Sequence, residues 1–406
     1  MKIKIILTLG LTVASAAILP GLAQTNVEER LKALEQSVKT LQAENKDLKS
    51  QLGWDGKAPL VLVKAGGKEA KLTLGGFVQG QGEFGDVPDA RFAGIEDRFL
   101  LRRARVNITG SFLEDFDFKL EADFGANSLS EQTGYRAQFT DAFLNWNRYD
   151  ALNLKFGQFK TPFGFEQLVS DTKLLTIERS LSNDRLTDGR QIGIAASGDF
   201  AKKRFGYSAG AFNGSGVNNS FNDNDNFMLA GRIYGVPYAG KIAKQDARWS
   251  IGINGLASED DGSSKGGFGF DSTPGTAALD NLFFGDRTAL GVDSQFTWGR
   301  FAFEAEWLRA QFDANNNLPT STLDAAGWYV MGTYYVLPKK LQALMKYESF
   351  DPNLDIDGNT SKTFTFGLTY FLKGDDLKFM VNYLYGKAGS AADYEGRLLT
   401  RLQFIF

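Results

Sequence analysis

The segment from Lys160 to Asp188 concentrates charged side chains of both signs. Its cations are Lys160, Lys173, Arg179 and Arg185, and its anions are Glu166, Asp171, Glu178, Asp184 and Asp188. Basic side chains at a narrow, poorly hydrated constriction replace the water that a passing anion loses. Because both signs occur together, the segment predicts a field across such a constriction rather than a funnel of one charge.

Chemistry that depends on cysteine or histidine is excluded, because the 406-residue chain contains neither. Disulfides, cysteine nucleophiles and imidazole bases are ruled out. Lys and Arg number 45 against 48 Asp and Glu, so the net charge of −3 gives no nucleic-acid footprint. The sequence predicts no enzyme, no cofactor, no metal site and no nucleic-acid partner. Two alternatives stay open: a Ser-Lys or paired-carboxylate site, and cation binding by the acidic residues Asp223, Asp225, Asp260 and Asp261.

The elements that must position these charges are strands. From residue 71 to the end, apolar and polar residues alternate, as in the run from Phe301 to Trp307, which predicts strands with one apolar and one polar face. Sixteen strands are predicted at 71–84, 96–112, 115–125, 137–148, 150–159, 189–200, 203–213, 226–237, 247–259, 285–298, 300–312, 325–337, 341–350, 361–373, 376–387 and 395–406.

Long and short gaps between these strands alternate. Gaps after even strands are mostly under four residues, with the segment Ala239–Asp246 as an exception, and the gaps after odd strands are longer. An even strand count, tight turns at one end and long loops at the other are typical of an outer-membrane barrel. The chain also ends on an aromatic residue, Phe406, and in this register Leu402 and Phe404 face lipid while Arg401 and Gln403 face the lumen.

A barrel of sixteen strands is too wide for side chains to fill, so the sequence predicts a pore. The third long gap, about 160–188, carries apolar residues such as Leu174, Ile177 and Leu181 that an exposed loop does not need. We expect it to fold into the lumen and narrow the channel; an exterior loop that caps the barrel is the alternative.

Three further segments precede the barrel. Residues 1–23 have a basic start, an apolar run and a small residue at the expected cut, which predicts a signal peptide; an uncleaved anchor is the alternative. Residues 24–53 carry a heptad pattern, which predicts a short α-helical coiled coil in the periplasm, or else a single amphipathic helix. Residues 54–70 are predicted as a linker.

Four blocks of sequence resemble the phosphate-selective porin O/P family. They are Arg102-Arg103-Ala104-Arg105, Gly157-Gln158-Phe159-Lys160-Thr161-Pro162-Phe163-Gly164, Glu178-Arg179-Ser180, and Asp188-Gly189-Arg190-Gln191-Ile192-Gly193. The resemblance covers about residues 70–406. It implies a trimeric sixteen-stranded barrel with an inward third loop, in which arginines line the pore and lysines stand at its neck.

The resemblance implies roles for particular residues. Lys173 is the best match to a neck lysine, and Arg103, Arg105 and Arg190 match the pore arginines; Lys160 and Arg179 belong to the same blocks. Each of these cations could instead be paired with a carboxylate of the barrel wall. Strict alternation points Arg102 toward lipid, where it is costly unless it lies near the rim. A bulge or a slipped register is the alternative, and it would turn Arg103 and Arg105 to the wrong face.

The predicted function is passive diffusion of small solutes, anions such as phosphate or polyphosphate, across the outer membrane. The alternatives are a general porin of low selectivity, which the inward carboxylates of Asp117, Glu121, Asp123, Glu304, Glu306 and Glu348 favour, and a structural protein tethered through its coiled coil. The predicted partners are two further copies of the chain, outer-membrane lipid and lipopolysaccharide, and small anions. With no histidine, conductance should change little between pH 6 and 8 unless another group is strongly shifted.

Overall fold

A computed structural model describes residues 35–40, 60–65, 68–125, 137–261, 284–314 and 322–406, in two units, 1–57 and 58–406. In the first unit, residues 35–40 are helical. The predicted signal peptide and the rest of the predicted coiled coil lie outside the described residues.

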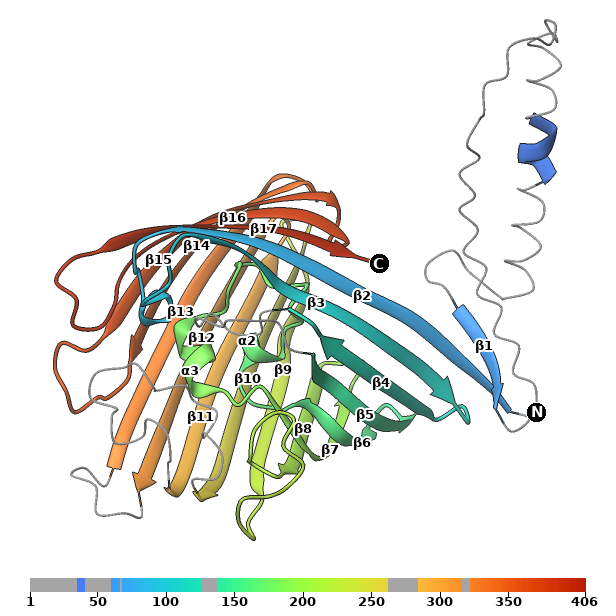
Figure 1. The fold of residues 1–406 in the computed structure, drawn as a ribbon, viewed down its shortest axis with the longest axis horizontal. Coiled ribbons are helices and arrows are strands. Elements are labelled where there is room, and N and C mark those ends of the chain that lie inside the picture. Colours follow the sequence, from blue (N-terminus) through green and yellow to red (C-terminus); the bar gives the residue numbers. More distant parts are fainter. Residues whose placement is uncertain (1–34, 41–59, 66–67, 126–136, 262–283, 315–321) are drawn as a thin grey trace, which may run out of the picture. The chain divides into compact units, whose positions relative to one another are not determined.

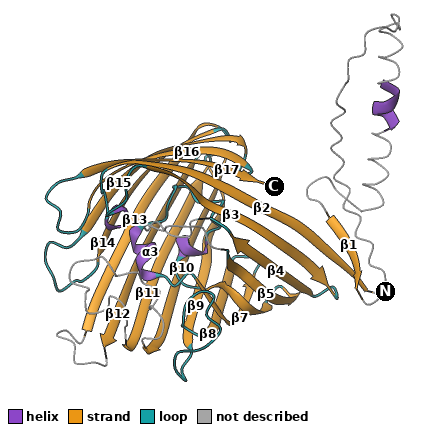
Figure 2. Ribbon diagram, viewed as in Figure 1, coloured by secondary structure: helices purple, strands orange, loops and turns teal. Residues whose placement is uncertain are grey.

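The second unit is a closed barrel (Figure 1; Figure 2). Within the described residues, sixteen antiparallel strands each pair with their neighbours in sequence, and β17 pairs with β2 to close the sheet. The all-β, sixteen-stranded prediction is therefore confirmed. The strands are β2 (Lys68–Gly85), β3 (Arg98–Phe112), β4 (Phe116–Asp123), β5 (Gln138–Tyr149), β6 (Leu152–Lys160), β7 (Arg190–Phe200), β8 (Phe205–Phe212), β9 (Met228–Ile242), β10 (Gln245–Asp261), β11 (Phe284–Trp298), β12 (Phe301–Ala314), β13 (Thr322–Leu337), β14 (Leu341–Asp351), β15 (Ser361–Lys373), β16 (Leu377–Lys387) and β17 (Glu395–Ile405).

One strand was not predicted. Strand β1 (Leu60–Ala65) falls within the segment predicted as a linker. It pairs with the first residues of β2, between Lys68 and Thr73, which lie beyond the part of β2 that pairs with β17. The segment between Leu60 and Ala65 is therefore ordered as a hairpin arm rather than as irregular chain.

The two faces of the sheet differ as the alternation predicts. On β17, Leu402 and Phe404 are half exposed on the outer face, whereas Arg401 and Gln403 are buried on the inner face. The barrel wall thus presents apolar side chains outward and polar side chains inward, which is the arrangement that a lipid environment requires. The helices of the described residues are short, and none has the length or apolar composition of a membrane span.

The prediction of one longer connection among the short turns, at Ala239–Asp246, is wrong. Strand β9 continues to Ile242 and β10 begins at Gln245, so only Ala243 and Lys244 connect them, with φ of 48° and 66°. Two positive φ values are the signature of a tight hairpin turn whose twist matches that of the strands. The segment Ala239–Asp246 therefore follows the same rule as the other short connections.

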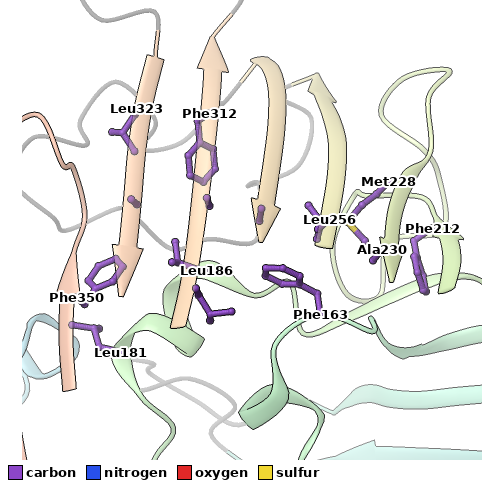
Figure 3. Packing of buried hydrophobic residues seen from close by; sticks show 14 of the residues in the cluster. Phe163, Leu181, Leu186, Phe212, Met228, Ala230, Leu256, Phe312, Leu323 and Phe350 are labelled. Carbon is purple, nitrogen blue, oxygen red and sulfur yellow. The ribbon is translucent and has the colours of Figure 1, made fainter. Parts of the chain in front are cut away.

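Residues 161–189, called the third loop below, lie inside the barrel (Figure 1). The loop carries α2 (Phe165–Leu168) and α3 (Leu181–Leu186), and α3 packs against β12, β13 and β14. Phe163, Leu181 and Leu186 point into an apolar cluster on the inner wall (Figure 3). Full burial of such a side chain contributes about 1.5–3 kcal/mol, so these three anchor the loop by roughly 5–9 kcal/mol.

The first loop, residues 86–97, also enters the lumen, which the sequence did not predict. Its 3₁₀ turn, η1 (Ala90–Phe92), is followed by Ile95, and both Phe92 and Ile95 are buried. They pack against Ile177 of the third loop and against the inner faces of β16 and β17. The two loops therefore share a second apolar cluster and narrow the lumen together.

Candidate functional site

A β-bulge places both arginines of the Arg102-Arg103 pair inside the barrel. Gln79 of β2 faces Arg103 and the next residue, Gly80, faces Leu101, so Arg102 is the extra residue of β3. A bulge lets two successive side chains share one face. Arg102, Arg103 and Arg105 are all buried. The bulge that the sequence left open is therefore present, and the expectation that it would turn Arg103 and Arg105 outward is wrong.

Asp171 of the third loop is surrounded by arginines. Its carboxylate lies 2.6 Å from Nη1 of Arg105, 2.8 Å from Nη1 of Arg179 and 3.4 Å from Nη2 of Arg103. Burial alone would raise the pKa of Asp171, but these guanidinium groups hold it well below the usual range. The carboxylate is therefore ionised at any pH at which the barrel is used.

Glu178 forms a second, similar centre in the same loop. Arg102 donates from Nε at 3.0 Å and from Nη2 at 3.1 Å to its two oxygens, and Arg401 donates from Nη2 at 2.6 Å. Against burial, these two arginines lower the pKa of Glu178. Asp171 and Glu178 thus place two carboxylates of the third loop against the arginines of β3 and β17.

A second bulge orients the partner of Arg190. Glu121 of β4 faces the extra residue of β5, so that Thr140 and Asp141 both point inward. The Nε of Arg190 donates to Asp141 at 2.7 Å. Lys160 instead donates to backbone carbonyls of the third loop, those of Gln167 at 2.6 Å and Val169 at 2.7 Å.

These side chains line a polar cavity of about 180 Å³ between the third loop and the β3 wall. Six guanidinium groups and four carboxylates face it, an excess of two positive charges. The cationic lining residues are Arg91, Arg102, Arg103, Arg105, Arg179 and Arg190, and the anionic ones are Asp171, Glu178, Asp184 and Asp188. A small cavity with this surplus of planar, bidentate guanidinium donors suits an oxyanion.

The structure brings most of the predicted site residues together. Arg103, Arg105, Arg179 and Arg190 line the cavity. Lys160 holds the adjoining stretch of the third loop. Lys173 does not join them: it is exposed on a turn of the third loop and is not among the residues that line the cavity.

Sequence reasoning missed Arg91, which reaches the cavity from the first loop. Asp89 orients it through bonds of 2.9 Å to Nε and 2.7 Å to Nη2, and Nη1 donates to the carbonyl of Arg179. Burial raises the pKa of Asp89, but Arg91 outweighs it and lowers the net value. The spacing of Asp89 and Arg91 was the available signal for this ion pair, but nothing in the sequence pattern indicated that the first loop turns inward.

Two buried carboxylates on the opposite wall, those of Glu306 and Glu348, anchor the loop. Glu306 of β12 accepts from the backbone N–H groups of Phe165 and Glu166 at the start of α2, and from Asn183 Nδ2 at 2.6 Å. Glu348 of β14 accepts from the N–H of Leu181 at 3.2 Å. Carboxylates at these positions satisfy helix N–H groups that have no partner within the helix.

The end of the third loop is held by a buried ion pair. Asp188 receives two hydrogen bonds from Arg287 of β11, at 3.1 and 3.2 Å. Asp260 of β10 lies 3.4 Å from Nε of the same arginine. Burial, with Asp260 nearby and against the opposing effect of Arg287, raises the pKa of Asp188 to about 6. Asp188 is therefore a cavity carboxylate that titrates near neutrality.

A closed sixteen-stranded barrel with an apolar outer wall and a charged internal loop is the architecture of an outer-membrane porin. Residues 78–406 match the family described as phosphate-selective porin O and P, and the chain belongs to this family. It is an outer-membrane channel, as the sequence predicts.

Individual relatives agree with this assignment. Porin O of Pseudomonas aeruginosa is 24% identical over 304 residues, which cover 70% of this chain and 68% of the relative. Among solved structures, the anion-selective porin from Comamonas acidovorans has a TM-score of 0.58 at 13% identity and covers 83% of this chain and 100% of its own. The trimer form of OmpT from Vibrio cholerae has a TM-score of 0.53 at 14% identity, and the match covers 83% of this chain and 99% of OmpT. These structures share the fold.

Proposed function

We propose that the chain conducts small anions passively, that phosphate and similar oxyanions are its preferred solutes, and that the arginine-lined cavity is the selective step. The observation that carries this proposal is the convergence of six guanidinium groups on one cavity. Guanidinium groups bind planar or tetrahedral oxyanions through paired donors and keep their charge at any working pH. The family's description and the anion-selective relative support the same class of solute.

A second candidate is a general porin with little ion preference. Every cluster of cavity arginines has a carboxylate within hydrogen-bond distance, as Asp171 has for Arg105 and Glu178 has for Arg102. If these pairs cancel the field, the cavity filters by size alone. The two candidates differ in the sign of the zero-current potential.

The test is made in planar lipid bilayers with a KCl gradient, followed by addition of phosphate. We expect a potential that indicates chloride preference and a chloride current that phosphate reduces. Arg103→Gln should weaken the phosphate effect at least fivefold, about 1 kcal/mol, because it removes one guanidinium from the cavity. Arg309→Gln is the matched control, since Arg309 lies exposed on β12 and pairs with Asp324. A cation-selective potential, or equal results for the two variants, would support the general porin instead.

We also propose three features of the assembled protein. Residues 1–23 are removed as a signal peptide, and residues 24–53 form a periplasmic coiled coil that aligns the barrels of a trimer in contact with lipid and lipopolysaccharide. The heptad pattern and the trimer form of OmpT from Vibrio cholerae support the oligomer. Cross-linking of the purified protein, with and without residues 24–53, tests it: a trimer that loses stability with the deletion is expected, and a monomer in both forms would contradict it.

A further inference from the structure

Two carboxylates of the third loop occupy positions among the arginines that a permeating oxyanion would need. Arg103, Arg105 and Arg179 contact Asp171, and Arg102 and Arg401 contact Glu178. Both acids belong to the loop and neither belongs to the wall. A carboxylate offers the same pair of acceptor oxygens to a guanidinium fork as one edge of a phosphate. The arginines are therefore already coordinated by anions that are covalently part of the chain.

Of the two, Asp171 has the side chain that can move while the loop backbone stays in place. Gln79 Nε2 donates to the backbone carbonyl of Asp171 at 3.1 Å, and Lys378 Nζ donates to that of Thr172 at 2.8 Å. The nearby residues Ser170 and Lys173 are exposed, and the backbone closes a small turn there through a bond of 2.8 Å from Lys173 N to Ser170 O. The turn lies between α2 and α3, so a shift of the Asp171 side chain leaves the anchors of both helices in place. Glu178, by contrast, lies next to buried Ile177 of the second apolar cluster.

The arginines around Asp171 do not depend on it for their positions. Arg105 also pairs with Asp123 at 2.7 Å, and Arg179 also donates to the carbonyls of Glu166 and Val169. Arg103 donates to Gln79 at 2.9 Å, and its Nε has no hydrogen-bond partner among the described residues. The anion-binding geometry should therefore survive when the Asp171 carboxylate moves away or is removed.

We propose that Asp171 is a tethered competitor for the anion site, which a permeating oxyanion displaces from Arg103, Arg105 and Arg179 and which returns when the ion leaves. The inference rests on the proposed function and adds a specificity-determining residue to it. A channel must bind its ion strongly enough to admit it and weakly enough to release it. A tethered carboxylate lowers the affinity of an arginine cluster that would otherwise retain phosphate, and it does so without removing any arginine.

The test compares two variants that each remove one negative charge from the same cavity. Asp171→Asn removes the competitor. Asp184→Asn is the control, because Asp184 also lines the cavity and belongs to the same loop, but its side chain is half exposed and its one ion pair among the described residues is with Arg185, at 4.0 Å. The full-length protein is recorded in planar bilayers, and the concentration of inorganic phosphate that halves the chloride current is measured.

For Asp171→Asn we expect half-block at a phosphate concentration at least tenfold lower than in wild type, with longer blocked intervals. For Asp184→Asn the change should stay below threefold. For Asp171→Glu, which keeps the charge on a longer side chain, the phosphate concentration at half-block should stay within threefold of wild type. This variant controls for a structural effect of substitution at position 171.

Equal shifts in Asp171→Asn and Asp184→Asn would overturn the inference, because they would report charge alone. Weaker block together with a larger conductance in Asp171→Asn would also overturn it, because the carboxylate would then be only an anchor of the loop. Failure of the proposed function looks different: wild type itself would show neither chloride preference nor phosphate block.

Discussion

Glu306→Gln tests how the third loop is held across the barrel. Glu306 accepts three hydrogen bonds from the loop, from the N–H groups of Phe165 and Glu166 and from Asn183 Nδ2. Glutamine has nearly the same shape but only one acceptor oxygen, and its amide N–H₂ would face a backbone N–H donor of α2. Because one oxygen of Glu306 accepts from both Glu166 and Asn183, the glutamine oxygen can keep these two bonds, and the bond from the N–H of Phe165 should be lost.

The expected magnitude follows from these contacts. A buried N–H group left without an acceptor costs about 1–3 kcal/mol, so the loss of the Phe165 bond weakens loop docking by about 1–3 kcal/mol. This shifts the ratio of detached to docked loop by roughly 5–150-fold. The apolar anchors Phe163, Leu181 and Leu186 remain, so the barrel should fold and the loop should open intermittently.

Single-channel recording in KCl is the assay, with limited trypsin digestion in detergent as a second readout. Glu306→Gln should show brief openings of larger conductance and cleavage after Lys173 or Arg179. Glu304→Gln is the matched control, because Glu304 precedes Glu306 by two residues on β12 and its side chain forms no hydrogen bond with the described residues. If the two variants show equally few openings of larger conductance and equal resistance to trypsin, the hydrogen bonds from α2 to Glu306 do not hold the loop.

Three further predictions follow from single residues. Because the pKa of Asp188 is raised to about 6, acidification from pH 7.5 to 5 should remove a negative charge from the cavity and increase chloride preference, with a midpoint near pH 6 in zero-current potentials; Asp188→Asn should show the acidic value throughout, and a flat profile in wild type would contradict the assignment. Gly157→Ala should prevent folding, since Gly157 has φ +125° and an added Cβ would lie 2.3 Å from the carbonyl oxygen of Ala142; heat-modifiable migration on gels should be lost, and normal migration would refute this. Lys173→Ala should leave phosphate block within twofold of wild type, because Lys173 is exposed outside the cavity; a larger loss in the same bilayer assay would restore it as a neck residue.

The strands could be predicted from the sequence because each must satisfy a local rule. One face of each strand meets lipid and the other meets water, so apolar and polar residues alternate along the strands from β2 to β17. The tight turns were also readable, except at Ala243-Lys244, where Tyr238 to Ile242 lacks clear alternation and the strand end could not be seen.

The arginine cavity was only partly predictable. A bulge adds one residue to one strand, and strict alternation then assigns the wrong face, as happened for Arg102. The inward course of the first loop depends on Phe92 and Ile95 meeting Ile177, a contact across more than eighty residues of chain. No local pattern encodes such a contact.

The inward carboxylates show a third limit. Counting Glu306 and Glu348 as lumen charges suggested a mixed pore, but both accept from N–H groups of the third loop, and Glu348 also pairs with Lys346 at 2.7 Å. Their role is visible only when the loop that they anchor is in place. Asp188 likewise changes the expectation of pH independence, because burial beside Asp260 gives a carboxyl the titration range of a histidine.

The central claim is that anions pass through the cavity lined by the β3 arginines and the third loop. The most direct measurement is anomalous diffraction from crystals of the protein soaked in bromide. The account predicts a bromide peak in the cavity among Arg103, Arg105 and Arg179. Bromide peaks elsewhere in the lumen, with none in this cavity, would contradict it.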